Sequence, residues 1–364
     1  MYLKRLKLKN YRLFSEVDIS FQYGMNILIG KNSTGKSTIL EAIDFLLSVD
    51  DANIPAEEII SYNKKNERTV QARIDGFFEM SDSEKDNICL VLENENIREL
   101  IRKSHLEIVF SKVIQKSGKN VQVTPNIQVN GDGVSNNSNL FNAFAGSLFP
   151  KLQTNNILRI IDQEKNYNIQ PVRPLNELRK LVPNNPAFLN QYLCSILYDI
   201  KQGNIDEFNN VKNEILKAYS EISDLDVEYD PKRAQVQIYF IKDESGIKIP
   251  LESEGWGIRE YFYLLLIFRN FSDTVILKDE ALTHMHKSLL NDFIMAIEGI
   301  KYQMITTSHI KELIKTLDFG NIIICRKFNG NATVKNLMQL EEMDKVLDEL
   351  GYPVDSVPEI GSLI

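Results

Sequence analysis

Cysteine and tryptophan are scarce in this chain, whose 364 residues include three cysteines and one tryptophan. The cysteines, Cys89, Cys194 and Cys325, lie far apart, and no two of them form a C-x-x-C pair. The sequence therefore predicts neither a zinc motif nor a disulfide framework. Because unpaired cysteines suit a reducing compartment, the expected location is the cytoplasm.

Long apolar segments and an excess of positive charge are also missing. The longest apolar stretch, Tyr261–Phe268, is far shorter than the ~20 residues that a membrane-spanning helix needs. The first residues lack the apolar core of a signal peptide, so we expect no membrane association. With 42 Lys and Arg against 50 Asp and Glu, the net charge is −8. Nucleic acid would thus need a local basic patch to bind.

Strand patterns alternate with helix patterns towards both ends of the chain. Residues 2–9 and 17–21 alternate polar and apolar side chains, which predicts a β-hairpin. Residues 25–29 (MNILI) form the continuous apolar run of a strand that is buried on both faces. Strand patterns return at 274–277 and 302–306, with a helix pattern between them. We therefore expect an α/β fold in which both ends of the chain share one sheet.

The middle of the chain has a different composition. Residues 131–139 (GDGVSNNSN) are the most loop-like stretch, which places a domain boundary there. The following residues to about 219 are mainly helical in pattern, and strand patterns return after them. The expected organisation is a discontinuous α/β domain over 1–130 and 245–340, a mixed, mainly helical insertion over 131–244, and a C-terminal helix and tail over 341–364.

A phosphate-binding motif follows the apolar run at once. Residues 30–37 (GKNSTGKS) match G-x-x-x-x-G-K-[ST], with a strand before and a helix after, as the motif requires. Gly30 and Gly35 let successive backbone N–H groups face phosphate oxygens, and the helix N-terminus favours the same anion. Lys36 is predicted to reach the β- and γ-phosphates of ATP, and Ser37 to ligate Mg²⁺. The predicted nucleotide-binding set is Gly30, Lys31, Asn32, Ser33, Thr34, Gly35, Lys36, Ser37 and Thr38.

Acidic residues end a second apolar strand. In VILKDE, Asp279 is placed to hold Mg²⁺ through water, and Glu280 to orient or deprotonate the attacking water. Lys278 stands where an aliphatic residue is expected, and a surface Asp-Glu pair is the alternative interpretation. His309, after the strand 304–307, is predicted to sense the γ-phosphate, with an ordinary surface histidine as the alternative. His284 and His286 resemble a metal-binding pair without a third ligand, so we favour a structural role or a dimer contact.

A second anion-binding pattern lies at residues 252–259 (ESEGWGIR). Ser253, Gly255 and Gly257 precede an apolar helix, and such a helix N-terminus favours an anion. Because the chain already has one phosphate-binding loop, this site is explained best if it closes over the nucleotide of a partner subunit. A simple loop with a helix cap is the alternative.

Five segments together resemble a known group. NYRLF at 10–14, GKNSTGKST, ESEGWGIRE, LKDEALTHMH and TTSH, in that order, resemble the ABC-type ATPases of the RecF, SMC and OLD families. The likeness covers roughly residues 1–50 and 250–350, and EALTHMH is closest to the OLD form. It implies an ABC-type P-loop ATPase head with an N-terminal antiparallel β subdomain and a mostly helical insertion. It also implies a homodimer or higher homo-oligomer, with ATP bound between heads.

The resemblance assigns a role to individual residues. It makes Asp279 the Walker B acid, Glu280 the catalytic base and His309 the switch histidine. Ser253–Gly257 would be the signature loop acting in trans, with either Ser253 or Gly255 in the place of the signature serine. Arg12 would line the nucleotide site, and Gln71 is the candidate for the Q-loop glutamine.

Three functions are consistent with these patterns. The favoured one is an ATP-hydrolysing switch that controls a separate effector, a nuclease or toxin, in antiphage defence; the chain shows no Toprim pattern, so no nuclease activity is expected. The alternative is a RecF-like DNA-repair ATPase, with Lys4, Arg5, Lys7, Lys9 and Arg12 on phosphates, although a solvated strand edge explains these residues better. The third is a scaffold without turnover, against which Glu280 argues.

Overall fold

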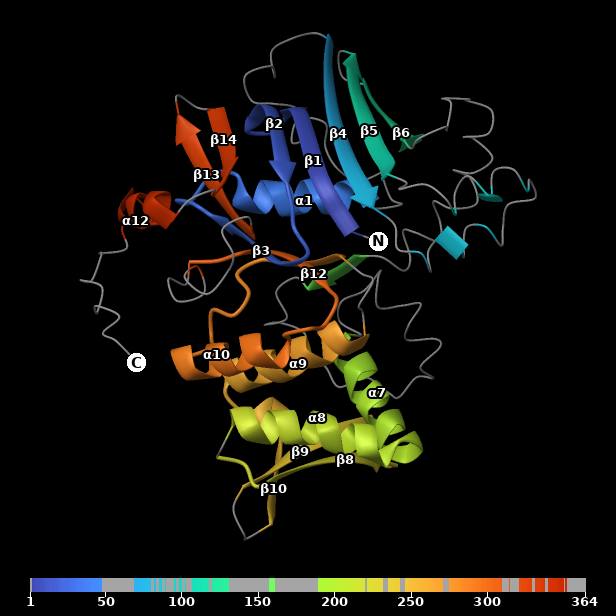
Figure 1. Cartoon of the computed structure of the whole chain (residues 1–364), viewed down its shortest axis with the longest axis vertical. Coiled ribbons are helices and arrows are strands. Elements are labelled where there is room, and N and C mark those ends of the chain that lie inside the picture. Colours follow the sequence, from blue (N-terminus) through green and yellow to red (C-terminus); the bar gives the residue numbers. More distant parts are fainter. Residues whose placement is uncertain are drawn as a thin grey trace. The chain divides into compact units, whose positions relative to one another are not determined.

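The computed structural model of the chain is shown in Figure 1. It describes residues 2–47, 69–79, 107–117, 120–130, 157–160, 189–219, 221–231, 235–242, 246–270, 275–309, 321–328, 331–337, 340–349 and 351, and the single positions 82, 85, 86, 89, 95, 98, 99, 102 and 314. The chain forms two compact units, residues 1–150 with 304–364, and residues 151–303. The expected boundary loop at 131–139 lies outside the described residues, so the domain boundaries stay predictions.

The first unit contains an antiparallel sheet in the order β2-β1-β4-β5-β6. Its strands are β1 (Tyr2–Tyr11), β2 (Phe14–Ser20), β4 (Thr69–Glu79), β5 (Glu107–Ser117) and β6 (Asn120–Asn130). The predicted hairpin is confirmed, with Leu6 opposite Ile19. The expected strand edge is wrong, because β1 lies between β2 and β4. Alternation reveals the buried face of a strand but not whether both of its edges are paired.

The phosphate-binding motif belongs to a second sheet, in which the strands of this unit follow the order β14-β13-β3-β12. They are β3 (Gly24–Ile29), β12 (Gln303–Thr307), β13 (Ile322–Phe328) and β14 (Asn331–Asn336). β3 pairs with β13 in parallel, Ile29 opposite Ile324, which confirms that both ends of the chain share a sheet. Met25–Ile29 are at most 1% exposed, as the apolar run predicts.

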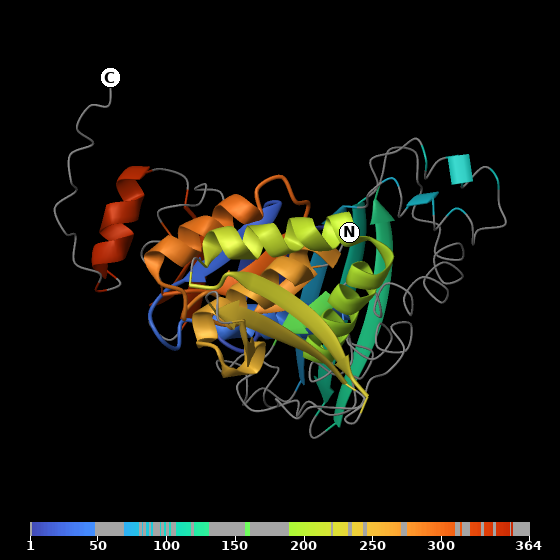
Figure 2. The same cartoon turned by 90° about the horizontal axis from the view of Figure 1, so that it is seen from below.

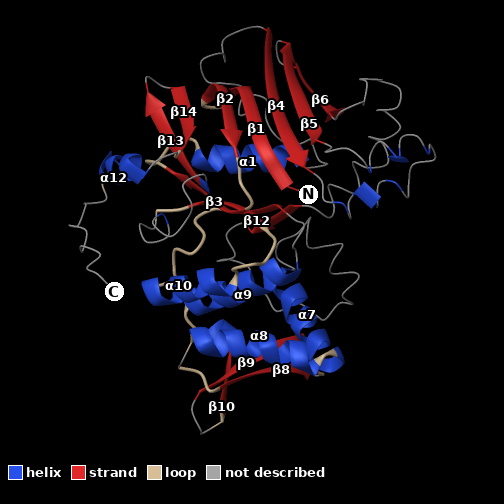
Figure 3. Ribbon diagram, in the orientation of Figure 1, coloured by secondary structure: helices blue, strands red, loops and turns tan. Residues whose placement is uncertain are grey.

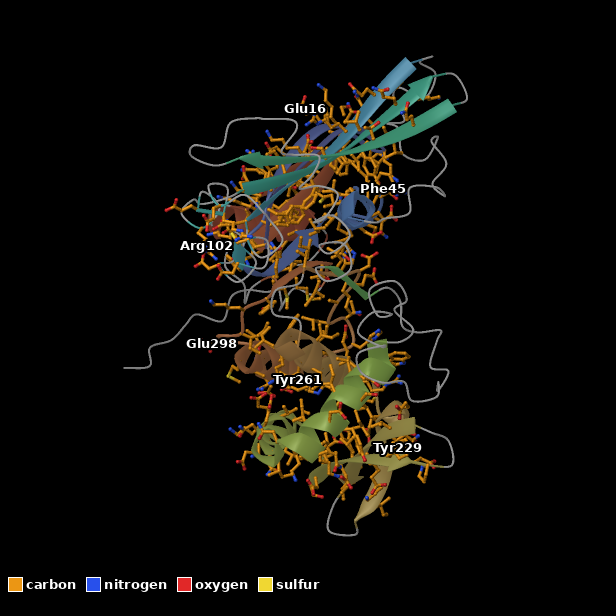
Figure 4. The ribbon with its side chains drawn as sticks, turned by 90° about the vertical axis from the view of Figure 1, so that its right-hand side faces the viewer. Glu16, Phe45, Arg102, Tyr229, Tyr261 and Glu298 are labelled. Carbon is orange, nitrogen blue, oxygen red and sulfur yellow. The ribbon has the colours of Figure 1, made fainter. Side chains whose placement is uncertain are left out.

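Two helices are described at length in the first unit, α1 (Lys36–Leu47) after β3 and α12 (Leu340–Glu349) after β14. α1 contacts β4 and β5 of the antiparallel sheet. Its Ile39, Ala42, Ile43 and Leu46 are fully buried, at the spacing of one helix face. The ring of Phe45, labelled in Figure 4, faces the Lys112 ammonium of β5, which lies 4.5 Å from the ring centroid. This packing fixes the start of α1, where the phosphate-binding loop ends.

The second unit joins helices to a small antiparallel sheet in the order β10-β9-β8, seen from below in Figure 2. Figure 3 shows that α7 and α8 lie along this sheet and that α9 and α10 run side by side. The elements are β7 (Ile157–Ile160), α7 (Leu189–Gly203), α8 (Ile205–Ala218), β8 (Asp224–Asp230), β9 (Gln235–Lys242), β10 (Ile247–Pro250), the 3₁₀ turn η4 (Leu251–Ser253), α9 (Trp256–Asn270), β11 (Val275–Lys278) and α10 (Lys287–Ala296).

α9 is the core helix of the second unit. Tyr261–Phe268 are at most 4% exposed, since the helix is apolar on all sides. The Tyr261 ring, labelled in Figure 4, packs edge-to-face on the Phe293 ring of α10, and 5.6 Å separates the ring centroids. β11 pairs in parallel with β7, Lys278 opposite Ile160. None of the helices in the described ranges is long and apolar enough to span a bilayer.

Candidate nucleotide-binding site

The loop from Gly30 to Gly35 joins β3 to α1 in a backbone shape that glycine permits. Gly35 has φ +101°, and a Cβ there would lie 2.6 Å from the Phe14 ring. Gly30 has φ +156°, and a Cβ there would lie 2.3 Å from the Cys325 carbonyl oxygen. Ser33 is also left-handed, at φ +63°. The loop thus runs directly against β13 and the start of β2, which leaves no room for side chains at either glycine.

Lys36 opens α1 and folds back over the loop. Its ammonium donates to the carbonyl oxygens of Gly30 at 2.7 Å and Lys31 at 3.1 Å, and the residue is 8% exposed. The Thr34 hydroxyl also donates to Lys31 O, at 2.8 Å. Since the first amides of a helix have no intrahelical acceptor, the start of α1 adds donors beside this ammonium. The arrangement is a positively charged backbone cradle suited to an anion.

The turn between β1 and β2 lies against the same loop. Arg12 sits in this turn with φ +46°, and its guanidinium donates to the Glu41 carboxylate of α1. Its Nε is buried and has no hydrogen-bond partner in the described ranges. Asn10 donates to the Gln71 carbonyl oxygen at 2.9 Å, which places Gln71 beside the turn with an exposed side chain. Burial raises the pKa of the neighbouring Tyr11 to about 12, an effect that Arg12 opposes.

β12 places His309 near the end of β3, the strand that precedes the phosphate-binding loop. Asn26 Nδ2 donates to Met304 O at 3.5 Å, and the Ser308 amide donates to Leu28 O at 3.3 Å. The two contacts advance together along both strands, so β12 runs parallel to β3. Because Leu28 lies two residues before Gly30, His309 follows β12 at the level where the phosphate-binding loop begins.

The backbone of Cys325 in β13 lies directly against Gly30 of the phosphate-binding loop. Burial raises the pKa of this thiol to about 12, although the Lys36 charge opposes the rise. The thiol therefore stays neutral and serves packing. No sequence pattern predicts this contact, because β3 and β13 lie near opposite ends of the chain.

The acidic pair lies in the second unit, directly after β11. Val275, Ile276 and Leu277 are buried, whereas Asp279 and Glu280 are exposed. Glu280 adopts φ +50° and Leu282 φ +67°, a conformation that costs free energy in residues other than glycine. Lys278 forms an ion pair with Glu260 of α9 at 3.3 Å, which explains why a lysine is tolerated at this position. The acids thus stand on a strained turn at the carboxyl end of a buried strand.

The predicted signature segment lies in the same unit as the acidic pair. Ser253 ends η4, and Ser253 and Gly255 are exposed. Gly257 is in the first turn of α9, where a Cβ would lie 2.4 Å from the His284 carbonyl oxygen. The Arg259 guanidinium lies 3.8 Å from the Trp256 ring centroid and donates to Glu252 O at 3.2 Å. The close approach at Gly257 joins the start of α9 to the turn after the acids.

The histidine pair has a structural role in part. His286 caps α10, since its Nδ1 accepts from the Leu289 amide at 3.4 Å. The His284 ring lies 6.0 Å from the Trp256 ring. Within the described part of the chain, no group of three or more His, Cys, Asp and Glu residues is placed to hold a metal.

The structure thus gathers the predicted residues into two groups. One unit holds the phosphate-binding loop with Arg12, Gln71 and His309, and the other holds Asp279 and Glu280 with Ser253, Gly255 and Gly257. Sequence reasoning missed Glu41, which pairs with Arg12, and Glu260, which pairs with Lys278. Lys278 was the available signal, since a lysine that ends a buried strand needs a counter-charge.

Comparisons with known proteins show what this chain is similar to. The ATP/GTP phosphatase of Helicobacter pylori is 23% identical over 87% of both chains. RecF of Streptococcus uberis is 40% identical over 18% of both chains, and the Rad50 ATPase of Thermoplasma volcanium 38% identical over 20% of this chain and 8% of its own. The alignments to these two relatives thus cover much less than two thirds of their lengths.

Solved structures share the fold. An Smc head bound to the C-terminal winged-helix domain of ScpA matches 94% of this chain and 99% of its own, with a TM-score of 0.59 and 18% identity. The SMC head domain of Thermotoga maritima matches 93% and 100%, with a TM-score of 0.53 and 14% identity. Residues 1–314 match the family described as the AAA ATPase domain. This chain therefore belongs to the AAA ATPase domain family, is similar to ABC-type ATPases of the RecF and SMC type, and has an SMC-head-like α/β fold.

Proposed function

We propose that this chain binds ATP with Mg²⁺ and hydrolyses it. The observation that carries the proposal is the loop between β3 and α1, where the buried Lys36 ammonium lies over carbonyl oxygens and Gly35 has no room for a side chain. A buried ammonium favours a nearby anion, and backbone amides at a helix start favour phosphate. The residues present therefore fit a magnesium-bound triphosphate.

Individual residues supply the remaining chemistry. Ser37 and Asp279 provide the oxygen ligands that Mg²⁺ prefers, and the bound ion would neutralise phosphate charge. Glu280 orients the attacking water and accepts its proton, which its exposure at the end of β11 allows. His309, beside the start of the loop, senses the γ-phosphate.

Two substitutions test the ATPase. Lys36→Ala is expected to abolish ATP binding, and Glu280→Gln to keep binding but to lower kcat by about 10²–10⁴-fold, the usual contribution of a general base. Isothermal titration and a phosphate-release assay measure the two effects. Lys345→Ala, at an exposed position of α12, is the control and should behave as wild type. Retained binding in Lys36→Ala would show that the cradle is misassigned, and unchanged turnover in Glu280→Gln would favour the scaffold without turnover.

We infer further that two copies close head-to-head around ATP and that this closure controls a separate effector, a nuclease or toxin, in antiphage defence. The exposed Ser253 and Gly255 beside the start of α9 support a contact with the nucleotide of the other copy. A genetic test expresses the gene of this chain together with the adjacent gene and measures protection of the cells against phage infection. Protection that is lost in Lys36→Ala supports the inference, and a recombination gene as neighbour with no protection contradicts it.

A DNA-repair ATPase is the second candidate, and the similarity to RecF and Rad50 favours it. The basic residues of β1 weigh against it, because several of their charges are paired with carboxylates. The Lys4 ammonium lies 3.9 Å from a Glu79 carboxylate oxygen. The Arg5 Nε and the Lys7 ammonium lie 3.8 and 3.3 Å from Asp18 carboxylate oxygens. ATP-dependent binding of duplex DNA that weakens steeply with salt would support this candidate. Absence of such binding favours the effector switch.

A further inference from the structure

One buried carboxylate contacts both sides of the acidic pair. The side chain of Glu260, in the second turn of α9, is 9% exposed. Its Oε1 accepts from the Leu282 amide at 2.9 Å and lies 3.3 Å from the Lys278 ammonium. Lys278 directly precedes the acids and Leu282 follows them, so Glu260 holds the segment at both ends.

The held segment needs such support. Glu280 and Leu282 both adopt positive φ, which residues with a Cβ rarely do, so the turn persists only where its surroundings determine it. Within the turn, the Thr283 hydroxyl donates to Glu280 O at 3.1 Å, and the Met285 amide donates to Leu282 O at 3.2 Å. The bond to Glu260 anchors this turn to α9.

Charge makes the contact strong and its loss costly. A carboxylate accepting from an amide forms a charge-assisted hydrogen bond, roughly twice as strong as a neutral one. Within the described part of the chain, the second oxygen of Glu260 is buried without a hydrogen-bond partner, so Oε1 makes the described contacts of this carboxylate. Removing one partner of a buried pair leaves an uncompensated charge.

We propose that Glu260 is the positioning residue that sets the direction of the Glu280 carboxylate, and that it links the first turns of α9 to this catalytic segment. The proposal rests on the ATPase function argued above. The adjacent Arg259 binds Glu252 O and the Trp256 ring, so two consecutive residues tie the signature segment and the acidic turn to one helix. A shift of α9 thus moves the acidic turn with it.

A graded series of variants tests the proposal. Glu260→Ala removes the acceptor and is expected to lower kcat by at least about tenfold, since misplacement by 1 Å costs up to about 10²-fold. The affinity for ATP should stay within twofold, because Lys36 and its loop are unchanged. Glu260→Gln keeps an acceptor without the charge, so its kcat should fall between those of wild type and Glu260→Ala.

Hydrogen exchange gives a readout that does not need turnover. The peptide containing residues 279–285 should lose protection in Glu260→Ala and lose less in Glu260→Gln. If the wild-type chain hydrolyses no ATP, the ATPase proposal fails, and the exchange series alone decides on Glu260. If Glu260→Ala does not fold, Glu260→Gln is compared with wild type by the same two measurements.

Glu214 of α8 supplies a matched control. Its carboxylate pairs with Arg269 near the other end of α9, and one of its oxygens is also buried without a hydrogen-bond partner among the residues that the structure describes. Glu214→Gln and Glu214→Ala should lower stability but change neither kcat nor the exchange of 279–285. An equal loss of kcat in the Glu214 and Glu260 series would overturn the proposal, as would an unchanged kcat and exchange pattern in Glu260→Ala.

Discussion

At the scale of single residues, the phosphate-binding loop is defined by missing side chains as much as by those present. The Phe14 ring lies against Gly35, and the Cys325 carbonyl lies against Gly30. The glycine pattern was visible in the sequence, because the motif is local. The residues that require it were not, because Cys325 comes from a strand near the other end of the chain.

Gly35→Ala is expected to destabilise the protein and to abolish nucleotide binding. The new methyl group would clash with the Phe14 ring, and alanine would have to adopt the left-handed backbone of Gly35, which costs on the order of 1–3 kcal/mol. Chemical unfolding and ATP titration measure the two losses. Gly203→Ala is the control, since Gly203 ends α7 with nothing within 4 Å of its Cβ position. An equal effect in both variants would contradict the steric explanation.

Charged partners show where residue-level prediction stops. Arg12 was predicted to line the nucleotide site from its place in a segment, and that role stays a prediction. The structure adds its contact with Glu41, five residues after Lys36 on α1. Lys278 was visible as a departure from the usual pattern, but its partner lies 18 residues upstream on another element. Pairings of this kind depend on how elements pack, which periodicity does not report.

At the scale of elements, a cluster of charges joins three pieces of the second unit. Asp226 of β8 accepts from Lys201 of α7 and, at 2.9 Å, from Lys248 of β10. Burial raises the pKa of Asp226, but the hydrogen bonds from these two lysines lower it. The lowering outweighs the effect of burial, and the pKa falls to about 2. The ionised Asp226 carboxylate therefore links α7 to the small sheet through these hydrogen bonds.

The stability of the second unit should depend on this group at low pH. Because the folded pKa lies below the usual 3.8, Asp226 contributes stability that is present above about pH 4 and lost as the pH falls towards 2. Asp226→Asn should thus be less stable than wild type at pH 7, and the difference should shrink between pH 4 and pH 2. Urea unfolding across this range measures it, with Asp348→Asn on α12 as control. A difference that is constant with pH would contradict the assignment.

Most elements were predictable because each has a local pattern. The apolar run before Gly30, the hairpin of β1 and β2, and the apolar helix α9 follow from alternation and helical spacing. The expectations were wrong where the neighbouring elements determine how a strand is paired. β1 was expected at an edge, yet both of its sides are paired. α10 begins at Lys287, because the His286 side chain caps it.

At the scale of the whole molecule, the predicted site residues are divided between the two compact units. Lys36, Ser37 and His309 belong to the first, and Asp279 and Glu280 belong to the second. Head-to-head closure would add a further set of contacts from Ser253 and Gly255 of a second copy.

Glu280→Gln with ATP and Mg²⁺ should form a stable dimer or a higher assembly, because closure persists when hydrolysis is blocked. Light scattering coupled to size exclusion measures the mass. Lys36→Ala combined with Glu280→Gln should stay monomeric under the same conditions, since it binds no nucleotide. A monomer in both cases would count against the trans contact.

The pairing of β3 with β13 also sets an order of events during synthesis. Ile29 lies opposite Ile324, so the strand that precedes the phosphate-binding loop is translated almost 300 residues before its partner. At ribosomal rates of about 5–20 residues per second, the early strand waits roughly 15–60 s for that partner. During this interval its apolar side chains lack their final cover, and we expect the nascent chain to depend on chaperones until β13 has emerged.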